Sequence, residues 1–230
     1  MDATAIVTGG TGGLGAGVVE KLLSEGWRTV VPWIVPREVE RLRSREGLEL
    51  VEADLFEGQS VARLVSVASA AGSPPVRGLV NLVGGFAAGG LVHETPVEQF
   101  EDQFRLNLRP TFLVTQAVLP LMLENGGGSI VCVGSRAAVA PFPGAAGYVA
   151  SKAAVIAFAQ AVSKEYLGRG IRSNAILPSV IDTPGNRASM PNADHDSWVK
   201  PGEIAGVISH LLSPASSPIS GAAIPVYGRA

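Results

Sequence analysis

Tyr148 and Lys152 stand four residues apart in a Tyr-x-x-x-Lys segment, and Ser135 lies thirteen residues before the tyrosine. Residues at the four-residue spacing share one face of a helix, so the pattern predicts a phenol beside an ammonium group. A neighbouring cation lowers the pKa of a tyrosine from its ordinary value of about 10. A phenol tuned in this way can pass a proton to or from a substrate oxygen.

Ser135 closes an apolar run, residues 129–134, that predicts a buried strand. A hydroxyl at the end of a strand can donate a second hydrogen bond to the same substrate oxygen. A tyrosine and a lysine at helical spacing also describe an ordinary surface helix, so the interpretation depends on what else the chain carries.

The amino terminus carries the pattern of a nucleotide-binding turn. An apolar segment at 4–7 runs into the glycine-rich segment 8–15, and apolar residues at helical spacing follow, among them Val18 and Leu22. Glycines allow the backbone to approach a pyrophosphate, and the amino end of the helix supplies N–H donors and a favourable dipole. Beside the Tyr-x-x-x-Lys segment, this turn predicts hydride transfer with a dinucleotide rather than a flexible loop.

The composition limits the class of protein. The 230 residues are 47% hydrophobic and 17% charged, which indicates one compact domain spanning 1–230. The net charge of −2 argues against nucleic acid or an anionic membrane as a partner. No apolar run reaches about 18 residues, and no metal-ligand spacing occurs. Met1 leads straight into the first strand and Cys132 is the single cysteine, so we expect a cytoplasmic protein without a signal peptide.

Strands and helices alternate along the chain, which predicts an α/β fold with a doubly wound parallel sheet of about seven strands in a single domain. We expect strands near 3–8, 28–35, 48–53, 77–83, 128–134, 171–177 and 222–227, and helices near 13–26, 37–46, 58–72, 96–125, 147–168 and 201–212. Loops 84–90 and 178–200 leave the carboxyl ends of strands, where open α/β sheets bind ligands. We expect the second to supply a substrate loop at about 184–200; the alternative is a surface insertion.

The chain resembles the short-chain dehydrogenase/reductase family over essentially its whole length, because it carries matching residues in the same order. The matching residues are Thr8, Gly9, Gly13, Gly15, Asp54, Leu55, Asn81, Gly84, Asn107, Ser135, Tyr148, Lys152, Asn174, Pro178 and Thr183. The resemblance implies a Rossmann fold and an NAD(P)-dependent oxidoreductase acting on a carbonyl or alcohol. It also implies a homo-tetramer or homo-dimer, which apolar residues of the two long predicted helices, such as Phe112 and Phe158, favour.

The resemblance implies a role for each polar residue. Tyr148 is the general acid in reduction and the base in oxidation, while Lys152 lowers its pKa and holds the nicotinamide ribose. Ser135 positions the substrate oxygen. Asn107 anchors a water that links Lys152 to solvent; the alternative is a structural asparagine that bends a helix. The residues implied at the cofactor are Gly9, Thr11, Gly13, Leu14, Gly15, Trp33, Arg37, Asp54, Leu55, Asn81, Gly84, Tyr148, Lys152, Pro178, Ile181 and Thr183.

The second strand departs from the family pattern. A carboxylate near its end ordinarily accepts a hydrogen bond from the ribose 2′-hydroxyl of NAD, but Trp33 stands there and the next carboxylate is Glu38. Arg37 can pair with a 2′-phosphate, or it can be a solvated residue of the next helix. We therefore expect NADP or NAD as the cofactor with NADP favoured, although the glycine turn carries no basic residue.

The sequence does not identify a single substrate. Residues 182–198 and the turn Gly84-Gly85-Phe86 resemble the dihydropteridine reductase branch, whereas Trp33 and Ser135 depart from it. Dihydropteridine reductase-like activity, 3-oxoacyl reduction, a quinone and a simple ketone all fit. A nucleotide-sensing or scaffold protein on the same fold is the alternative outside enzymes, and the retained tyrosine and lysine argue against it. We expect a pocket for a planar or moderately apolar molecule, lined by Phe86, Arg136, Phe142, Met190 and Trp198.

Overall fold

A computed structural model describes residues 2–42 and 44–229. Within them, seven strands form one parallel sheet in the order β3-β2-β1-β4-β5-β6-β7. The strands are β1 (Thr4–Thr8), β2 (Arg28–Trp33), β3 (Leu48–Glu52), β4 (Val76–Asn81), β5 (Gly128–Val133), β6 (Ile171–Pro178) and β7 (Ala223–Val226). The helices are α1 (Gly15–Ser24), α2 (Pro36–Val39), α3 (Gly58–Ala68), α4 (Val97–Asn107), α5 (Arg109–Glu124), α6 (Ala146–Tyr166), α7 (Pro184–Ser189) and α8 (Pro201–Leu212). The predicted fold class is confirmed.

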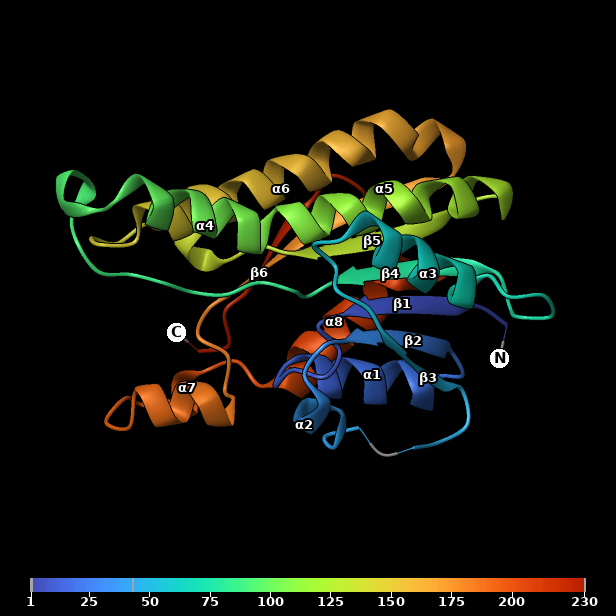
Figure 1. Cartoon of the computed structure of the whole chain (residues 1–230), viewed down its shortest axis with the longest axis horizontal. Coiled ribbons are helices and arrows are strands. Elements are labelled where there is room, and N and C mark those ends of the chain that lie inside the picture. Colours follow the sequence, from blue (N-terminus) through green and yellow to red (C-terminus); the bar gives the residue numbers. More distant parts are fainter. Residues whose placement is uncertain (1, 43, 230) are drawn as a thin grey trace.

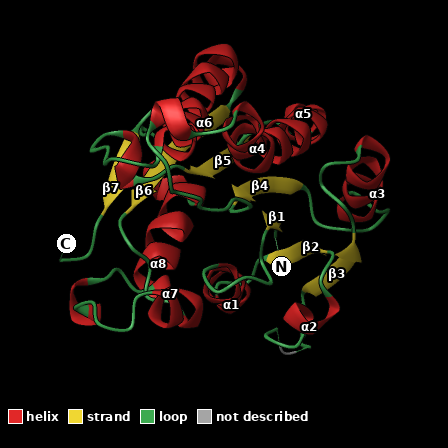
Figure 2. Ribbon diagram, turned by 60° about the vertical axis from the view of Figure 1, so that its left-hand side comes forward, coloured by secondary structure: helices red, strands yellow, loops and turns green. Residues whose placement is uncertain are grey.

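The strand order reverses once, beside β1. The chain first moves outward from β1 to β3, crosses back to β4 and then moves outward to β7, and Figure 2 shows the strands in this order across the molecule. In a parallel sheet, such a reversal leaves a crevice at the carboxyl ends of the two strands where the connections diverge. The site is therefore expected where β1 and β4 end.

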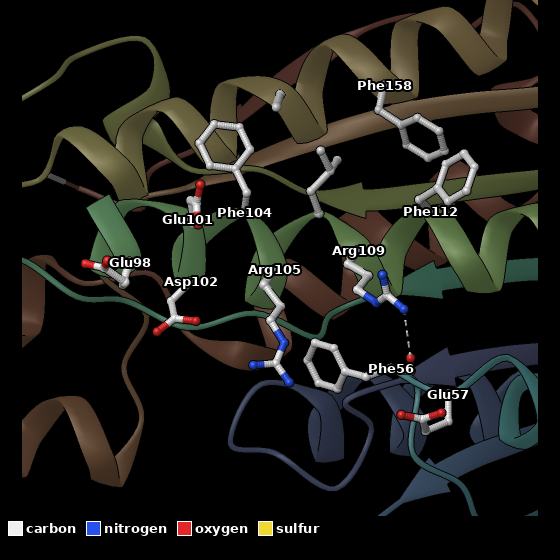
Figure 3. Close-up of a pocket in the computed structure, with 12 residues that line it drawn as sticks. Phe56, Glu57, Glu98, Glu101, Asp102, Phe104, Arg105, Arg109, Phe112 and Phe158 are labelled. Carbon is white, nitrogen blue, oxygen red and sulfur yellow. Dashed lines mark hydrogen bonds between the residues drawn. The ribbon is translucent and has the colours of Figure 1, made fainter. Parts of the chain in front are cut away.

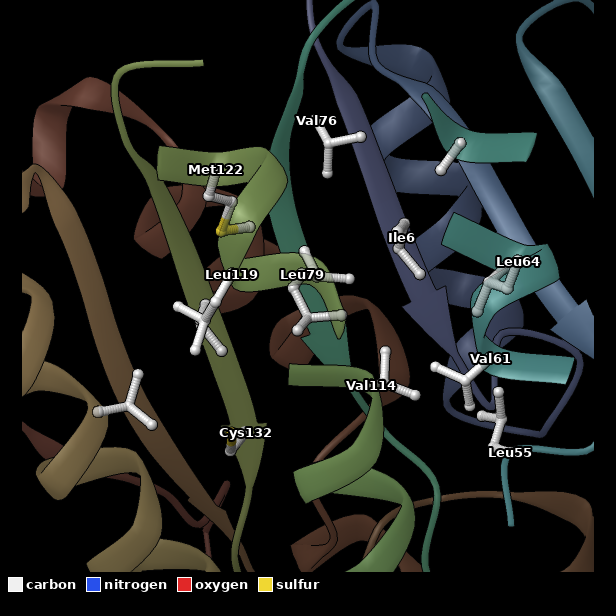
Figure 4. Close-up of a cluster of buried hydrophobic side chains, with 14 of the residues drawn as sticks. Ile6, Leu55, Val61, Leu64, Val76, Leu79, Val114, Leu119, Met122 and Cys132 are labelled. Carbon is white, nitrogen blue, oxygen red and sulfur yellow. The ribbon is translucent and has the colours of Figure 1, made fainter. Parts of the chain in front are cut away.

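Both faces of the sheet are covered, because successive side chains of a strand point to opposite faces. Ile6 packs in a cluster with residues of α3, α5 and α6, including Leu64 and Val114 (Figure 4). Its neighbour Val7 packs on the other face, against α1 and α8. Figure 1 shows α4, α5 and α6 on one side of the sheet and α1 on the other. This double burial explains why the strands are almost continuously apolar.

Two predicted helices differ from the structure. The helix predicted at 96–125 is two helices that meet at Leu108, because Pro110 lacks an N–H for the preceding turn and its ring crowds that turn's carbonyl. The helix predicted at 37–46 is the single turn α2, and no residue of α2 is buried. Without packing, so short a helix is not extended. Arg43, within that prediction, lies outside the described residues.

Two helical stretches among the described residues, Val97–Glu124 and Ala146–Arg169, are long and apolar enough to cross a membrane by length and composition alone. The first contains α4 and α5, and the second contains α6. Val118, Met122 and Val155 from these stretches belong to the cluster that packs on the sheet. Core helices meet the same criterion, so these stretches are explained by the fold.

Candidate active site

A cleft of about 480 Å³ opens at the carboxyl ends of β1, β4, β5 and β6. It brings together the glycine turn after β1, the turn after β4, the end of β5, the first turns of α6 and the segment after β6. The predicted site residues that line it are Gly9, Thr11, Gly13, Leu14, Gly15, Gly84, Phe86, Ser135, Tyr148, Lys152, Pro178 and Ile181. Segments far apart in the sequence thus converge at this cleft.

The glycine turn forms a cradle without side chains. A β-carbon at Gly15 would collide with the carbonyl oxygen of Gly9, so only glycine fits there. No side chain caps the amino end of α1, whose first N–H groups follow directly from this turn. An uncapped helix terminus beside a glycine turn is the arrangement that binds a pyrophosphate. These residues therefore fit the dinucleotide that the sequence predicts.

Lys152 is buried in the wall of the cleft. Its Nζ donates a hydrogen bond to the carbonyl oxygen of Val133 at 3.0 Å. Burial disfavours the charged form and lowers the pKa of Lys152 from 10.5 to about 8. At neutral pH the ammonium is thus close to releasing its proton, which suits a group that passes protons.

Burial raises the pKa of Tyr148 above its ordinary value, and a hydrogen bond with the Ser135 side chain partly offsets this rise. In this structure Ser135, rather than Lys152, is the side chain that lowers the Tyr148 pKa. The Ser135 oxygen also accepts the N–H of Ala137 at 3.1 Å. The backbone donor holds the serine oxygen in place, and its O–H can still donate a hydrogen bond.

Asn107 connects the catalytic helix to the turn after β4. Its Oδ1 accepts the N–H of Gly85 at 2.9 Å, and its Nδ2 donates to the hydroxyl of Ser151 at 3.0 Å. That hydroxyl donates in turn to the carbonyl oxygen of Tyr148 at 2.9 Å. Ser151 was missed in the sequence, although its place three residues after Tyr148 was the available signal.

The absence of a side chain at Gly84 brings Asn107 close to Lys152. A β-carbon at Gly84 would lie 2.6 Å from Asn107 Oδ1 and 2.9 Å from Lys152 Nζ. The two atoms are thus no farther apart than the sum of these distances, a gap that one water molecule can bridge.

Two exposed aromatic rings stand beside the phenol. The Phe86 ring meets Tyr148 edge-on with centroids 4.9 Å apart, and Phe142 lies 6.3 Å from Phe86. Phe86 is 61% exposed and Phe142 is 46% exposed. Gly89 donates to the carbonyl oxygen of Gly144 at 2.8 Å, which ties the two segments together. The result is an apolar wall next to the Tyr148 ring.

The late loop is closed at its base by a bridge between Ile181 and Val199, and α7 within it lies near the C-terminus in Figure 1. Trp198 was predicted to line the substrate pocket, but it is only 6% exposed and its ring packs on His195 with centroids 4.4 Å apart. Trp198 therefore belongs to the interior of the loop. Met190 is exposed, and Asn186 lines the cleft.

Several predicted residues lie outside the cleft lining. Asn81 is buried and donates to the Thr115 hydroxyl at 3.1 Å, and the Asp54 carboxylate accepts the N–H of Phe56 at 2.9 Å. The others outside the lining are Trp33, Arg37, Leu55, Asn107, Arg136, Phe142, Met190, Thr183 and Trp198. The lining residues that the sequence analysis did not name for the site are Gly12, Glu38, Leu82, Val83, Gly85, Val133, Gly134, Ser179 and Asn186.

Glu38 takes the place where Arg37 was expected. Arg37 is exposed, whereas Glu38 lines the cleft and its Oε2 accepts the Thr11 hydroxyl at 3.3 Å. Its Oε1 pairs with Arg41 at 3.2 Å. The signal was present in the sequence, because Glu38 is the first carboxylate after β2.

Comparison with known proteins gives consistent results. Residues 3–194 match the family described as short chain dehydrogenase. The 2-(R)-hydroxypropyl-CoM dehydrogenase of Xanthobacter autotrophicus is 36% identical over 193 residues, 80% of this chain and 76% of the relative. The 3-oxoacyl-[acyl-carrier-protein] reductase MabA of Mycobacterium tuberculosis is 31% identical over 236 residues, 99% of this chain and 92% of the relative.

Solved structures agree closely in fold. A short-chain type dehydrogenase/reductase from Mycobacterium ulcerans superposes with a TM-score of 0.91 at 26% identity, covering 100% of this chain and 90% of the other. The 3-ketoacyl-(acyl-carrier-protein) reductase of Brucella melitensis, complexed with NADH, has a TM-score of 0.87 at 27% identity, covering 99% and 98%.

The buried lysine gives the stability a defined pH dependence. The unfolded chain keeps the Lys152 proton up to pH 10.5, but the folded protein releases it near pH 8. Between these values the unfolded chain binds more protons, so the free energy of unfolding rises with pH through this window. Lys152→Met removes the buried charge. We expect the variant without nucleotide to be more stable than wild type at pH 7, by on the order of 1–3 kcal/mol.

Thermal and urea unfolding of both proteins from pH 6.5 to 10 measures this difference. The difference in the free energy of unfolding between Lys152→Met and wild type should shrink as the pH rises from 8 toward 10.5. Lys164→Met, at an exposed lysine of the same helix, is the matched control and should show no such trend. A gap between Lys152→Met and wild type that stays constant with pH would contradict the assignment.

Proposed function

The chain belongs to the short-chain dehydrogenase family and is an NAD(P)-dependent oxidoreductase, and we propose that Tyr148 is the proton carrier of its reaction with a carbonyl or alcohol. One observation carries this proposal: Tyr148 and Ser135 line the same cleft as the glycine turn. A carbonyl oxygen placed between them receives two hydrogen bonds. Bound nicotinamide nucleotide supplies or accepts the hydride.

Each polar residue of the cleft has its own role in the proposed reaction. In reduction, Tyr148 donates its proton to the substrate oxygen, and its raised pKa keeps the phenol protonated until then. Ser135 donates the second hydrogen bond and stabilises the negative charge that grows on that oxygen. Lys152, with a pKa of about 8, resupplies the proton. Asn107 lies beside Lys152 and links it toward the turn at Gly85.

Tyr148→Phe tests this assignment. Removing the phenolic oxygen should lower turnover by about 10²- to 10⁴-fold, the usual contribution of a positioned acid or base. Nucleotide binding, measured by fluorescence titration, should persist because the ring stays in place. Tyr166→Phe, at the far end of the same helix, is the control and should keep wild-type turnover. Turnover of Tyr148→Phe within a few-fold of wild type on a panel of carbonyl compounds would exclude Tyr148 as the proton carrier.

For the cofactor, we propose NAD(H) rather than the NADP(H) that the sequence pattern favoured. Glu38 faces the cleft beside Thr11 of the glycine turn, where its carboxylate can accept a hydrogen bond from a ribose 2′-hydroxyl. A 2′-phosphate would meet the same carboxylate and be repelled. Arg41 is already paired with Glu38 and donates to the carbonyl oxygen of Thr11 at 2.9 Å. Its guanidinium is therefore not available to bind a 2′-phosphate.

Glu38→Gln should reduce the preference for NADH over NADPH by about ten- to a hundredfold, since hydrogen bonds to charged groups contribute about 1.5–3 kcal/mol. Dissociation constants of both nucleotides, measured by titration of wild type and variant, give this ratio without any substrate. Glu40→Gln changes the net charge equally at a neighbouring exposed position and should leave the ratio unchanged. NADPH binding to wild type as tightly as NADH would reject the proposal.

The segment at about 184–200 is the substrate loop in this proposal. Thr183 caps α7 at its start, and the Asp182 carboxylate pairs with the Arg187 guanidinium. These contacts give the loop its own structure next to the cleft. A 3-oxoacyl thioester is one candidate substrate, because MabA and the Brucella melitensis protein carry that activity in their names.

We also propose that the chain forms a two-fold dimer through α4, α5 and α6. A groove of about 810 Å³ runs along these helices (Figure 3). Phe112 is 45% exposed in it, and its ring lies 5.9 Å from that of Phe158. An exposed apolar groove of this kind is typical of an interface.

The charges along the groove are self-complementary. Glu98, Glu101 and Asp102 stand at one end, whereas Arg105 and Arg109 stand nearer Phe112 and Phe158, with Glu57 below Arg109 (Figure 3). A two-fold axis pairs such helices antiparallel, which sets the acidic end of one copy against the basic end of the other. A second copy of this chain is therefore the partner that this surface fits.

Phe112→Glu should convert the assembly to monomers, because it places a charge in the apolar centre of the proposed interface. Light scattering coupled to gel filtration at micromolar concentration measures the mass. Leu167→Glu introduces the same charge at an equally exposed leucine, at the far end of α6, and should leave the mass unchanged. A monomeric wild type, or a Phe112→Glu protein of unchanged mass, would contradict the interface.

A further inference from the structure

One partly buried arginine lacks the partners that its counterparts have. Among the described arginines, Arg28, Arg136 and Arg172 are partly buried. Arg28 pairs with the Glu49 carboxylate, and Arg172 donates to the carbonyl oxygen of Leu211 at 2.8 Å. Within residues 2–42 and 44–229, Arg136 has no hydrogen-bond acceptor and no carboxylate. Its guanidinium lies over the Tyr227 ring, 5.1 Å from the centroid.

The position of Arg136 is as informative as its lack of partners. It follows Ser135 directly and begins a short 3-10 helix, Arg136–Ala138. The carbonyl oxygen of Tyr227 accepts the Ser179 hydroxyl at 2.7 Å, and Ser179 lines the cleft. Arg136 itself is outside the cleft lining, but its neighbour Ser135 and the Tyr227-bonded Ser179 both line the cleft, so the guanidinium lies close to the active site.

A half-buried cation without an anion is unfavourable, because part of its hydration is lost without compensation. The Tyr227 ring holds the guanidinium in place through its π face but does not neutralise the charge. A guanidinium fixed in this way is prepared to bind a carboxylate, phosphate or sulfonate through two parallel hydrogen bonds. Within residues 2–42 and 44–229, no carboxylate supplies the complementary anion.

We propose that Arg136 binds an anionic group of the substrate, so that the substrate is a carbonyl compound or alcohol carrying an anion a few bonds from the reacting carbon. This inference rests on the proposed function, because the reacting oxygen is placed at Tyr148 and Ser135. Phe86 and Phe142 form an apolar wall beside Tyr148, and Arg136 lies toward β7. The two substituents of a ketone would then meet different surroundings, which fixes the face that receives hydride.

Steady-state kinetics on matched substrate pairs tests the proposal. Oxo acids of three chain lengths are compared with their methyl esters, and dihydroxyacetone phosphate is compared with dihydroxyacetone to separate carboxylate from phosphate. Wild type should favour at least one anionic member in kcat/KM. Arg136→Gln should reduce that preference by about ten- to a hundredfold, mostly through KM, as expected for a lost hydrogen bond to a charged group. Neutral substrates should change less than threefold.

Arg169→Gln is the matched control, since it removes one positive charge at an exposed position beyond the end of α6. A second measurement needs no turnover: the preferred anion's unreactive analogue, pentanoate or glycerol phosphate, should raise the melting temperature of the nucleotide complex in wild type and Arg169→Gln but not in Arg136→Gln. Equal losses on charged and neutral substrates, no preference for any anion in wild type, or a thermal shift that Arg136→Gln retains would overturn the proposal. Absence of turnover on every carbonyl, with the Arg136-dependent shift retained, would instead count against the proposed function.

Discussion

Lys152 places an ionisable amine in the buried wall of the cleft, and the surrounding chain is arranged around that group. The carbonyl oxygen of Val133 accepts its hydrogen bond at the end of β5. Gly84 has no side chain, which leaves room for both the amine and the Asn107 amide. Any other residue at Gly84 would fill this space. Burial then brings the pKa of Lys152 to about 8, so the same arrangement that accommodates the amine also makes its proton transferable.

The sheet places these groups without any of them being adjacent in the sequence. Because β1, β4, β5 and β6 are parallel neighbours, their carboxyl ends meet at one edge. The turn after β1 therefore contributes the glycine cradle, and the turn after β4 leaves space for the lysine. The end of β5 contributes a serine hydroxyl, and the segment after β6 forms the base of the late loop. The cores on both faces hold these ends in register, since Ile6 and Val7 of one strand belong to opposite clusters.

The fold and the central site were predictable because they depend on local patterns, namely strand alternation, glycine spacing and Tyr148 with Lys152 on one helix face. What failed depended on packing between distant segments. Trp198 looked like a pocket residue, but its ring finds His195 within its own loop. Glu38 was visible as the first carboxylate after β2, yet only the short turn of α2 directs it to Thr11. A single sequence does not reveal which neighbour a side chain such as that of Glu38 will face.

Our proposals for cofactor and substrate place specificity in charges around the cleft rather than at its centre. A carboxylate, Glu38, stands by the glycine turn, and a guanidinium, Arg136, stands by β7. Arg41 and Thr11 hold the Glu38 carboxylate in place, where in our proposal it accepts a hydrogen bond from a ribose hydroxyl. Among the described residues, Arg136 meets an aromatic ring and no carboxylate, so in our proposal its charge is available to a ligand. In our proposals these two ionic groups act differently because, among the described residues, Glu38 has a counter-ion and Arg136 does not.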